Sequence, residues 1–111
     1  MKKSLITGNN YLYNTICGLC GDYDRRERAI AEGTEHIYTL LEYRRLNEAI
    51  DRAISSVCEE DICHIMRKEI ANHIGCRYTK IPYRSNSSVK RLKQRSMLAI
   101  ARELHLIGGK E

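Results

Sequence analysis

The sequence has neither tryptophan nor phenylalanine, and its 111 residues include one proline and seven glycines. Residues that interrupt regular structure are therefore scarce. A β-sandwich or a β-barrel needs turn residues about every ten positions, so this composition favours helices over sheets. The apolar runs extend over only a few residues, whereas a membrane-spanning helix needs about 20. The sequence therefore excludes a transmembrane helix.

Length and composition predict one domain, residues 1–111. Apolar residues make up 42% of the chain and charged residues 30%, which supports a modest core and argues against general disorder. Lys2 and Lys3 precede a short apolar stretch, but Thr7 and Gly8 end it, so we expect no signal peptide. We therefore expect a protein of the cytoplasm.

The five cysteines are an odd number, and without an export signal we expect free thiols in a reducing compartment. Cys17 and Cys20 match the Cys-x-x-Cys-Gly pattern of zinc sites. Cysteines three residues apart also fit a helix that buries two small apolar side chains. We therefore expect no metal and no other cofactor, with Cys17 and Cys20 as the candidate ligands if zinc does bind. A structural zinc needs four ligands, and the second pair would have to come from Cys58, Cys63, His64 and Cys76.

The net charge of +5 is distributed unevenly along the chain. Residues 1–20 carry +2, residues 21–76 carry −4 and residues 77–111 carry +7. A mildly acidic body joined to a basic C-terminal third is expected when one end of a protein meets a polyanion. A solvated basic helix without a partner is the alternative.

Hydrophobic periodicity predicts a first helix over residues 10–31, with Gly33 just past its end. Two glycines weaken its middle, so we expect a break near residues 18–22. A second helix is predicted to begin with Thr34 as its N-cap and to continue for about six turns. Its apolar residues recur at spacings close to three and four and are Ile37, Leu40, Leu41, Leu46, Ile50, Ala53, Ile54 and Val57.

A third helix is predicted over residues 59–74, with acidic residues in its first turn and Gly75 just after its end. Its buried apolar side is predicted to consist of Ile62, Ile65, Met66, Ile70 and Ile74. A fourth helix is predicted to begin with Ser87 or Ser88 as its N-cap and to end near Leu106. These elements predict an all-α fold, a small bundle of about four helices.

Within this bundle we expect a loose N-terminus at residues 1–8 and a helical body at residues 10–57. Residues 59–107 are predicted to form a helix-turn-helix-like unit that carries a long loop at residues 76–86. Pro82 prevents a helix from continuing through that loop.

The third helix ends with the pattern of the first helix of a helix-turn-helix. Ile70 and Ile74 point inward, Ala71 lets a second helix cross closely, and Gly75 permits the turn. A helix-turn-helix normally joins its helices through about three or four residues. Here the loop at residues 76–86 is an insertion.

The fourth helix has the pattern of a recognition helix. At about 100° per residue, Val89, Leu92 and Ile100 fall on one side, and Lys93 lies at the edge of that side with its amine extended to solvent. Leu98 falls on the outward side, where it is exposed or contacts a partner. The outward side also collects basic and amide side chains, which are Lys90, Arg91, Gln94, Arg95 and Arg102.

These side chains suit DNA. Lysine and arginine release counterions from phosphates, and arginine and glutamine bond guanine and adenine edges in the major groove. The backbone amides of Ser87 and Ser88 suit a phosphate contact at the helix start. On the loop, Arg77, Lys80 and Arg84 would add phosphate contacts. The alternative is that the inserted loop moves the two helices out of the geometry that reads DNA.

Three motifs resemble one protein family. The segments Ile-Ala-x-x-Ile-Gly, Ser-Val-Lys-Arg-Leu-Lys-x-Arg and Ile-Ala-x-x-Leu-x-Leu-Ile resemble the sigma-region-4-like regulators of Gram-positive phages and prophages, such as the ArpU- and RinA-type late-gene activators. The resemblance extends over roughly residues 44–107. It implies a non-enzymatic transcription regulator that binds double-stranded DNA in the host cytoplasm. The positions that it implies for DNA contact are Ser88, Lys90, Arg91, Gln94 and Arg95.

Further candidate partners are RNA polymerase and a second copy of the chain. The alternative function is a small helical protein–protein interaction factor that dimerises or binds the host polymerase and does not read DNA. Cys63 and His64 are neighbours on a helix and point about 100° apart, so they do not converge as a nucleophile and its base. We therefore do not expect an enzyme.

Overall fold

The computed structural model describes residues 10–72 and 85–106, and within these residues it contains helices and no strand. The all-α class is therefore confirmed. There are five helices in the described part of the chain because the first predicted helix is divided in two. They are α1 (Asn10–Gly21), α2 (Tyr23–Glu32), α3 (Ile37–Ser55), α4 (Glu60–Asn72) and α5 (Asn86–Glu103).

The division between α1 and α2 falls at Asp22, inside the segment where the glycines predicted a break. Arg26 is buried at this corner, although α2 otherwise exposes its charged residues. Its guanidinium donates to the side-chain oxygen of Asn47 at 2.7 Å and to the carbonyl of Leu19 in the last turn of α1. A cation is favourable at this helix C-terminus because the last carbonyls lack partners within the helix. Arg26 therefore ties α1, α2 and α3 together at the corner.

Two predicted N-caps are wrong, and competing hydrogen bonds explain one of them. Gly33 ends α2 with a left-handed φ of 62°, as predicted, and the N–H of Thr34 also bonds back to Ala29. Thr34 thus belongs to the end of α2, and α3 is capped by His36, whose Nδ1 accepts the N–H of Tyr38 at 3.2 Å.

The N-cap of α5 is Ser85 rather than Ser87 or Ser88. The backbone of Ser85 is extended, and its hydroxyl oxygen accepts the N–H of Ser88 at 3.2 Å. At the other end, α5 stops at Glu103, three residues before the predicted end. His105 adopts a left-handed φ of 58° and the N–H of Leu106 bonds to Ala101.

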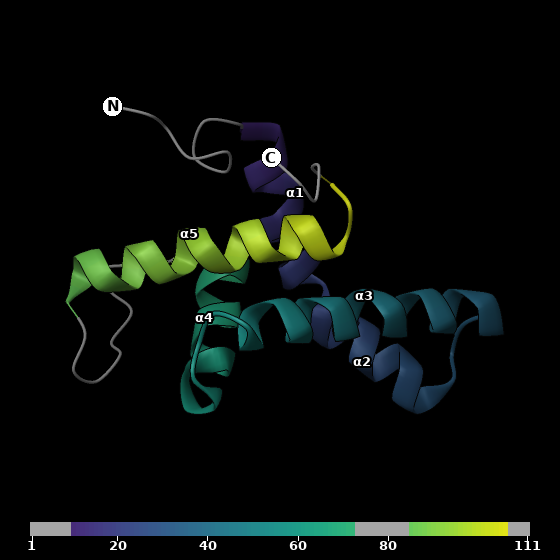
Figure 1. Ribbon diagram of the computed structural model, residues 1–111. Coiled ribbons are helices and arrows are strands. Elements are labelled where there is room, and N and C mark those ends of the chain that lie inside the picture. The colour runs from purple at the N-terminus through teal and green to yellow at the C-terminus, as the bar shows by residue number, and fades with distance from the viewer. Residues whose placement is uncertain (1–9, 73–84, 107–111) are drawn as a thin grey trace.

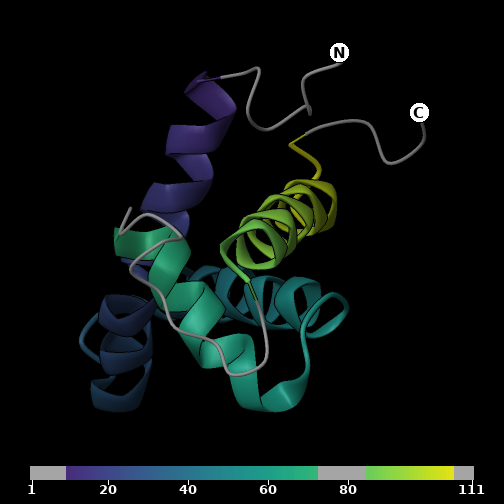
Figure 2. The same cartoon turned by 90° about the vertical axis from the view of Figure 1, so that its left-hand side faces the viewer.

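The bundle has a thick end and a projecting end (Figure 1). At the thick end α5 lies along α3 in the opposite direction, while α1 and α4 pack together beside them. Figure 2 views this end with α5 nearly end-on, and α1 and α4 lie on the same side of it. At the projecting end α2 packs against the N-terminal half of α3 and extends away from α5.

The core lies at the thick end, and the predicted apolar side of α4 is confirmed by its buried Ile62 and Ile70. The apolar side of α3 is buried only in its C-terminal half, since Ile37 and Leu41 are 57% and 54% exposed. Leu98, predicted to point outward, is partly buried against the core. The largest fully buried apolar side chains come from α1, α3, α4 and α5 and are Ile16, Ile50, Ile54, Met66, Ile70, Met97 and Ile100.

Several predictions fall outside the described residues: the loose N-terminus at residues 1–8, the end of the third helix at Ile74 and Gly75, and most of the loop at residues 76–86. Among the described residues, no helix combines the length and the apolar character needed to cross a bilayer.

Candidate nucleic-acid interface

The helix α5 has the two sides that its sequence predicts. Val89, Leu92 and Ile100 are buried, and Ser96 between them is fully buried as well. The thiol of Cys58 lies 3.5 Å from the hydroxyl of Ser96, which satisfies this polar side chain inside the core. Burial along one side fixes which side of α5 faces solvent.

Lys90, Arg91 and Arg95 are exposed on the other side of α5, and Gln94 among them is half-buried. We refer to these four residues as the α5 basic face. The three cations form no hydrogen bond or ion pair with any residue that the structure describes. The only carboxylate of α5 is Glu103 at its far end, where it pairs with Arg52 at 3.1 Å. Within residues 10–72 and 85–106, no carboxylate neutralises the positive charge of this face.

A buried ion pair anchors α5 behind this face. The ammonium of Lys93 lies 2.9 Å from a carboxylate oxygen of Glu69 on α4, and the side chains are 10% and 0% exposed. The Lys93 ammonium also lies 5.5 Å from the ring centre of Tyr13 on α1. Lys93 thus joins α5 to two helices, and the prediction that its amine extends to solvent is wrong.

Electrostatics keep this buried lysine charged. Burial alone would lower the pKa of Lys93, but its hydrogen bonds to Glu69 and Tyr13 outweigh that effect and raise the pKa above its ordinary value. Rotation of α5 about its axis would separate the two charges inside the core, which is costly. The pair therefore holds the basic face at one orientation.

Sequence reasoning missed Glu69, although its position carries a signal. Glu69 lies three residues after Met66 and seven after Ile62, so it shares their buried side of α4. Lys93 lies four residues after buried Val89. Two opposite charges that both fall on buried helix sides predict a buried pair, because an isolated buried charge is unfavourable.

The remaining predicted contact residues divide into two groups. Ser88 is half-buried, and its backbone N–H donates to the hydroxyl oxygen of Ser85. The prediction that this amide contacts a phosphate is therefore wrong. The predicted loop residues lie outside the described part of the chain and are Arg77, Lys80 and Arg84.

The two candidate zinc ligands are buried in the core. Cys17 and Cys20 are each 2% exposed. Burial raises the pKa of both thiols, that of Cys20 to about 12, which opposes the thiolate form that binds zinc. In residues 10–72 and 85–106, no group of three or more histidine, cysteine or acidic side chains could hold a metal ion.

A cavity lies between α3 and α4. In this site the Cys63 thiol donates to the carbonyl of Glu59 at 3.3 Å, and Nδ1 of His64 lies 3.3 Å from the Arg67 guanidinium. No hydrogen bond joins Cys63 and His64, so the described geometry does not form a thiol–imidazole pair. The cavity has a volume of about 240 Å³ and is lined by Asp51, Ile54, Ser55, Glu60, Cys63, His64 and Arg67.

Comparisons of the chain with protein-family models, with curated proteins and with solved structures gave no match. We therefore infer function from the chemistry of its own residues.

Proposed function

We propose that this protein is a DNA-binding transcription regulator of phage or mobile-element origin that places the α5 basic face against double-stranded DNA. The observation that carries the proposal is the set of three exposed cations, Lys90, Arg91 and Arg95, without carboxylate partners among the described residues. In this role the protein acts in the cytoplasm of the host, with RNA polymerase as a further partner.

The dimensions and the chemistry of α5 support this role. A helix of 18 residues is about 27 Å long, and the major groove of B-DNA admits an α-helix. Each phosphate neutralised by a lysine or an arginine releases counterions, and arginine and glutamine can also bond base edges. Gln94 lies between Arg91 and Arg95 on this face, so one helix offers both kinds of contact.

The experiment is a binding titration with duplex DNA from the genetic neighbourhood of the protein and with a scrambled duplex of the same length. If the three cations each meet a phosphate, log K falls with log salt concentration with a slope of about −2.7. Affinity for the neighbouring DNA should exceed that for the scrambled duplex. Absent binding, or binding that does not change with salt, would contradict the proposal and favour the protein–protein interaction factor.

A pair of matched variants assigns the contact to α5. Arg91→Ala with Arg95→Ala should weaken binding by about 2 kcal/mol or more, roughly 30-fold in Kd, if both arginines contact bases. Arg25→Ala with Arg52→Ala removes the same charge from arginines that already pair with Asp22 and Glu103, and it should weaken binding far less. Equal effects of the two double variants would exclude the α5 basic face as the contact.

A further inference from the structure

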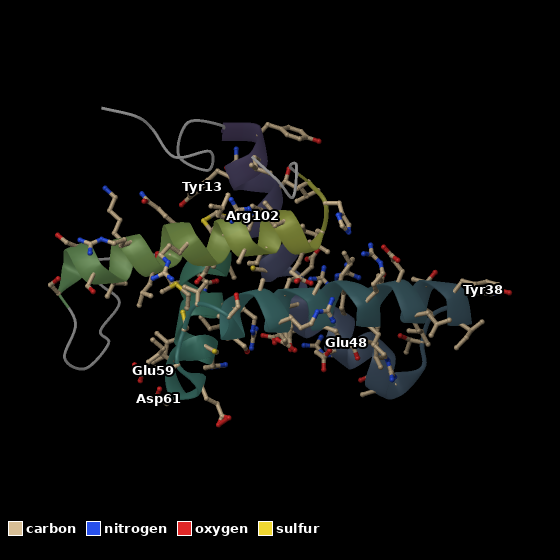
Figure 3. All side chains as sticks on the ribbon, in the orientation of Figure 1. Tyr13, Tyr38, Glu48, Glu59, Asp61 and Arg102 are labelled. Atoms are coloured by element: carbon tan, nitrogen blue, oxygen red, sulfur yellow. The ribbon has the colours of Figure 1, made fainter. Side chains whose placement is uncertain are left out.

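The first two turns of α3 expose three large apolar side chains. Ile37, Tyr38 and Leu41 are 57%, 75% and 54% exposed. They lie at the projecting end of the molecule, where Figure 3 labels Tyr38 far from the acidic start of α4 at Glu59 and Asp61. Apolar side chains that gather on one short helix face mark an interaction surface. We call residues 37–45 of α3 the α3 tip.

Polar side chains of the α3 tip are already ordered for a contact. The ring of Tyr38 stacks on His36 with 5.2 Å between ring centres. The Arg45 guanidinium is held by two oxygens of Glu42 at 2.9 and 2.6 Å. Order before binding lowers the entropy cost of forming an interface. Arg44 is exposed and has no partner among the described residues.

The positions around α3 show what fits this surface. At about 100° per residue, Leu41 lies at the centre of the exposed face. Tyr38 and Arg45 lie on one edge of it, and Ile37 and Arg44 lie on the other. Each edge thus holds one ring or apolar side chain and one arginine, separated by about seven residues along the helix.

We propose that the α3 tip binds the α3 tip of a second copy of this chain, with the two helices antiparallel and Leu41 facing Leu41 at the two-fold axis. In an antiparallel pair of this symmetry, each edge faces the same edge of the other copy. Tyr38 then meets the Arg45 guanidinium of the second copy in a cation–π contact, and Ile37 lies under the aliphatic stem of its Arg44. Both edges are therefore self-complementary.

The size of the contact sets its strength. The α3 tip is only about 13 Å long, and a stable dimer buries at least about 1,200 Å². We therefore expect a weak, reversible dimer. The thick ends of the two copies do not collide, because α1, α4 and α5 pack around the other half of α3 (Figure 1) and the antiparallel arrangement places them at opposite ends. The proposal does not depend on DNA binding.

The dimer proposal is tested by sedimentation velocity of the full chain under reducing conditions. The protein concentration runs from about 10 µM to about 1 mM, a range that suits a weak contact. The wild type should shift from monomer to dimer with rising concentration. Leu41→Glu should raise the dissociation constant at least about tenfold, because two leucines leave the interface together. The control Tyr11→Ser removes another large exposed side chain, 81% exposed on α1, and should leave the constant unchanged. A wild type that stays monomeric at 1 mM, or equal effects of the two variants, would overturn the proposal.

Cross-linking tests the arrangement of the two helices. In a background with Cys63→Ser and Cys76→Ser, a short bis-maleimide should join two copies of Leu41→Cys. Glu48→Cys lies on the same exposed face, but the two copies of residue 48 are about 21 Å apart along the helix axis in the antiparallel pair, and they should not be joined. Cross-linking at 48 but not at 41 would overturn the antiparallel pairing.

Discussion

The cations of the α5 basic face and those of the preceding helices have opposite surroundings. In α2, α3 and α4 most cations pair with a carboxylate: Arg25 with Asp22, Arg45 with Glu42, Arg52 with Glu103, and Arg67 and Lys68 both with Asp24. The hydrogen bond from Lys68 lowers the pKa of Asp24, which keeps this carboxylate charged. On α5, Lys90, Arg91 and Arg95 have no such partners among the described residues.

Arg28 and Arg44 are also exposed without a partner in the described part of the chain, but each has an acidic residue four positions away on its own helix, Glu32 or Glu48. Net charge alone therefore does not distinguish the two regions. They differ in whether the cations of one face have carboxylates beside them among the described residues.

The largest expected effect on stability comes from Lys93, the one cation of α5 that is buried. Lys93→Met should lower the free energy of unfolding by about 3–5 kcal/mol, because it leaves the Glu69 carboxylate buried and unpaired. Urea denaturation followed by circular dichroism measures the loss. Lys93→Met combined with Glu69→Leu removes both charges and should recover most of it. If Lys93→Met unfolds at the same urea concentration as the wild type, the pair does not anchor α5.

A smaller effect on stability comes from the buried thiol of Cys20 on α1. Burial raises the pKa of Cys20 from 9.0 to about 12, so its contribution to stability is complete below pH 9 and is lost as the pH rises toward 12. As the pH rises, the Cys20 thiol ionises in the unfolded chain before it ionises in the folded one. Between pH 7 and pH 10 this difference alone should lower the free energy of unfolding by about 1.4 kcal/mol. Urea midpoints at the two pH values measure this. Cys20→Ala, although less stable overall, should lose correspondingly less, and an identical loss in both proteins would contradict the assignment.

Single cations from the two regions should differ in the salt dependence of DNA binding. Lys90→Ala should make the slope of log K against log salt less steep by about 0.9, the change for one phosphate contact. Arg52→Ala removes a cation that already pairs with Glu103 and should leave the slope unchanged. Fluorescence anisotropy at several salt concentrations measures both, and equal slopes for the two variants would remove the distinction between the regions.

The smallest expected effect tests the paired region. Arg45→Ala breaks an ion pair whose side chains are 54% and 52% exposed, and pairs of this kind contribute about 0.2–1 kcal/mol to stability. Urea denaturation at a protein concentration too low for self-association should therefore show a small loss. A loss near that of Lys93→Met would mean that surface pairing carries much more of the stability than we infer.

Local patterns in the sequence predicted much of the fold. The glycines marked the break before α2 and its end at Gly33, and periodicity identified the buried side of α4. The positions of Lys90, Arg91 and Arg95 on the exposed side of α5 also followed from helix geometry. These features depend on residues within one or two turns of each other.

Features that depend on distant residues did not follow from the sequence. Periodicity shows that Ile37 and Leu41 share a side of α3, but whether another helix covers that side depends on where α5 ends in space. The pairing of Lys93 with Glu69 joins residues 24 positions apart. The cap at His36 is a local feature that was also missed, because it depended on a competition for backbone hydrogen bonds that a propensity does not resolve.

Few residues of α2 are buried, and this has a consequence for hydrogen exchange. Its buried residues are Arg26 and Ala29, whereas the other four helices share the large apolar side chains. Amide protons of α2 should therefore exchange through a local opening of low free energy, and those in the middle of α4 and α5 only when the whole bundle opens. We therefore expect α2 to open and re-form many times during one lifetime of the folded thick end, without disturbing the orientation of α5.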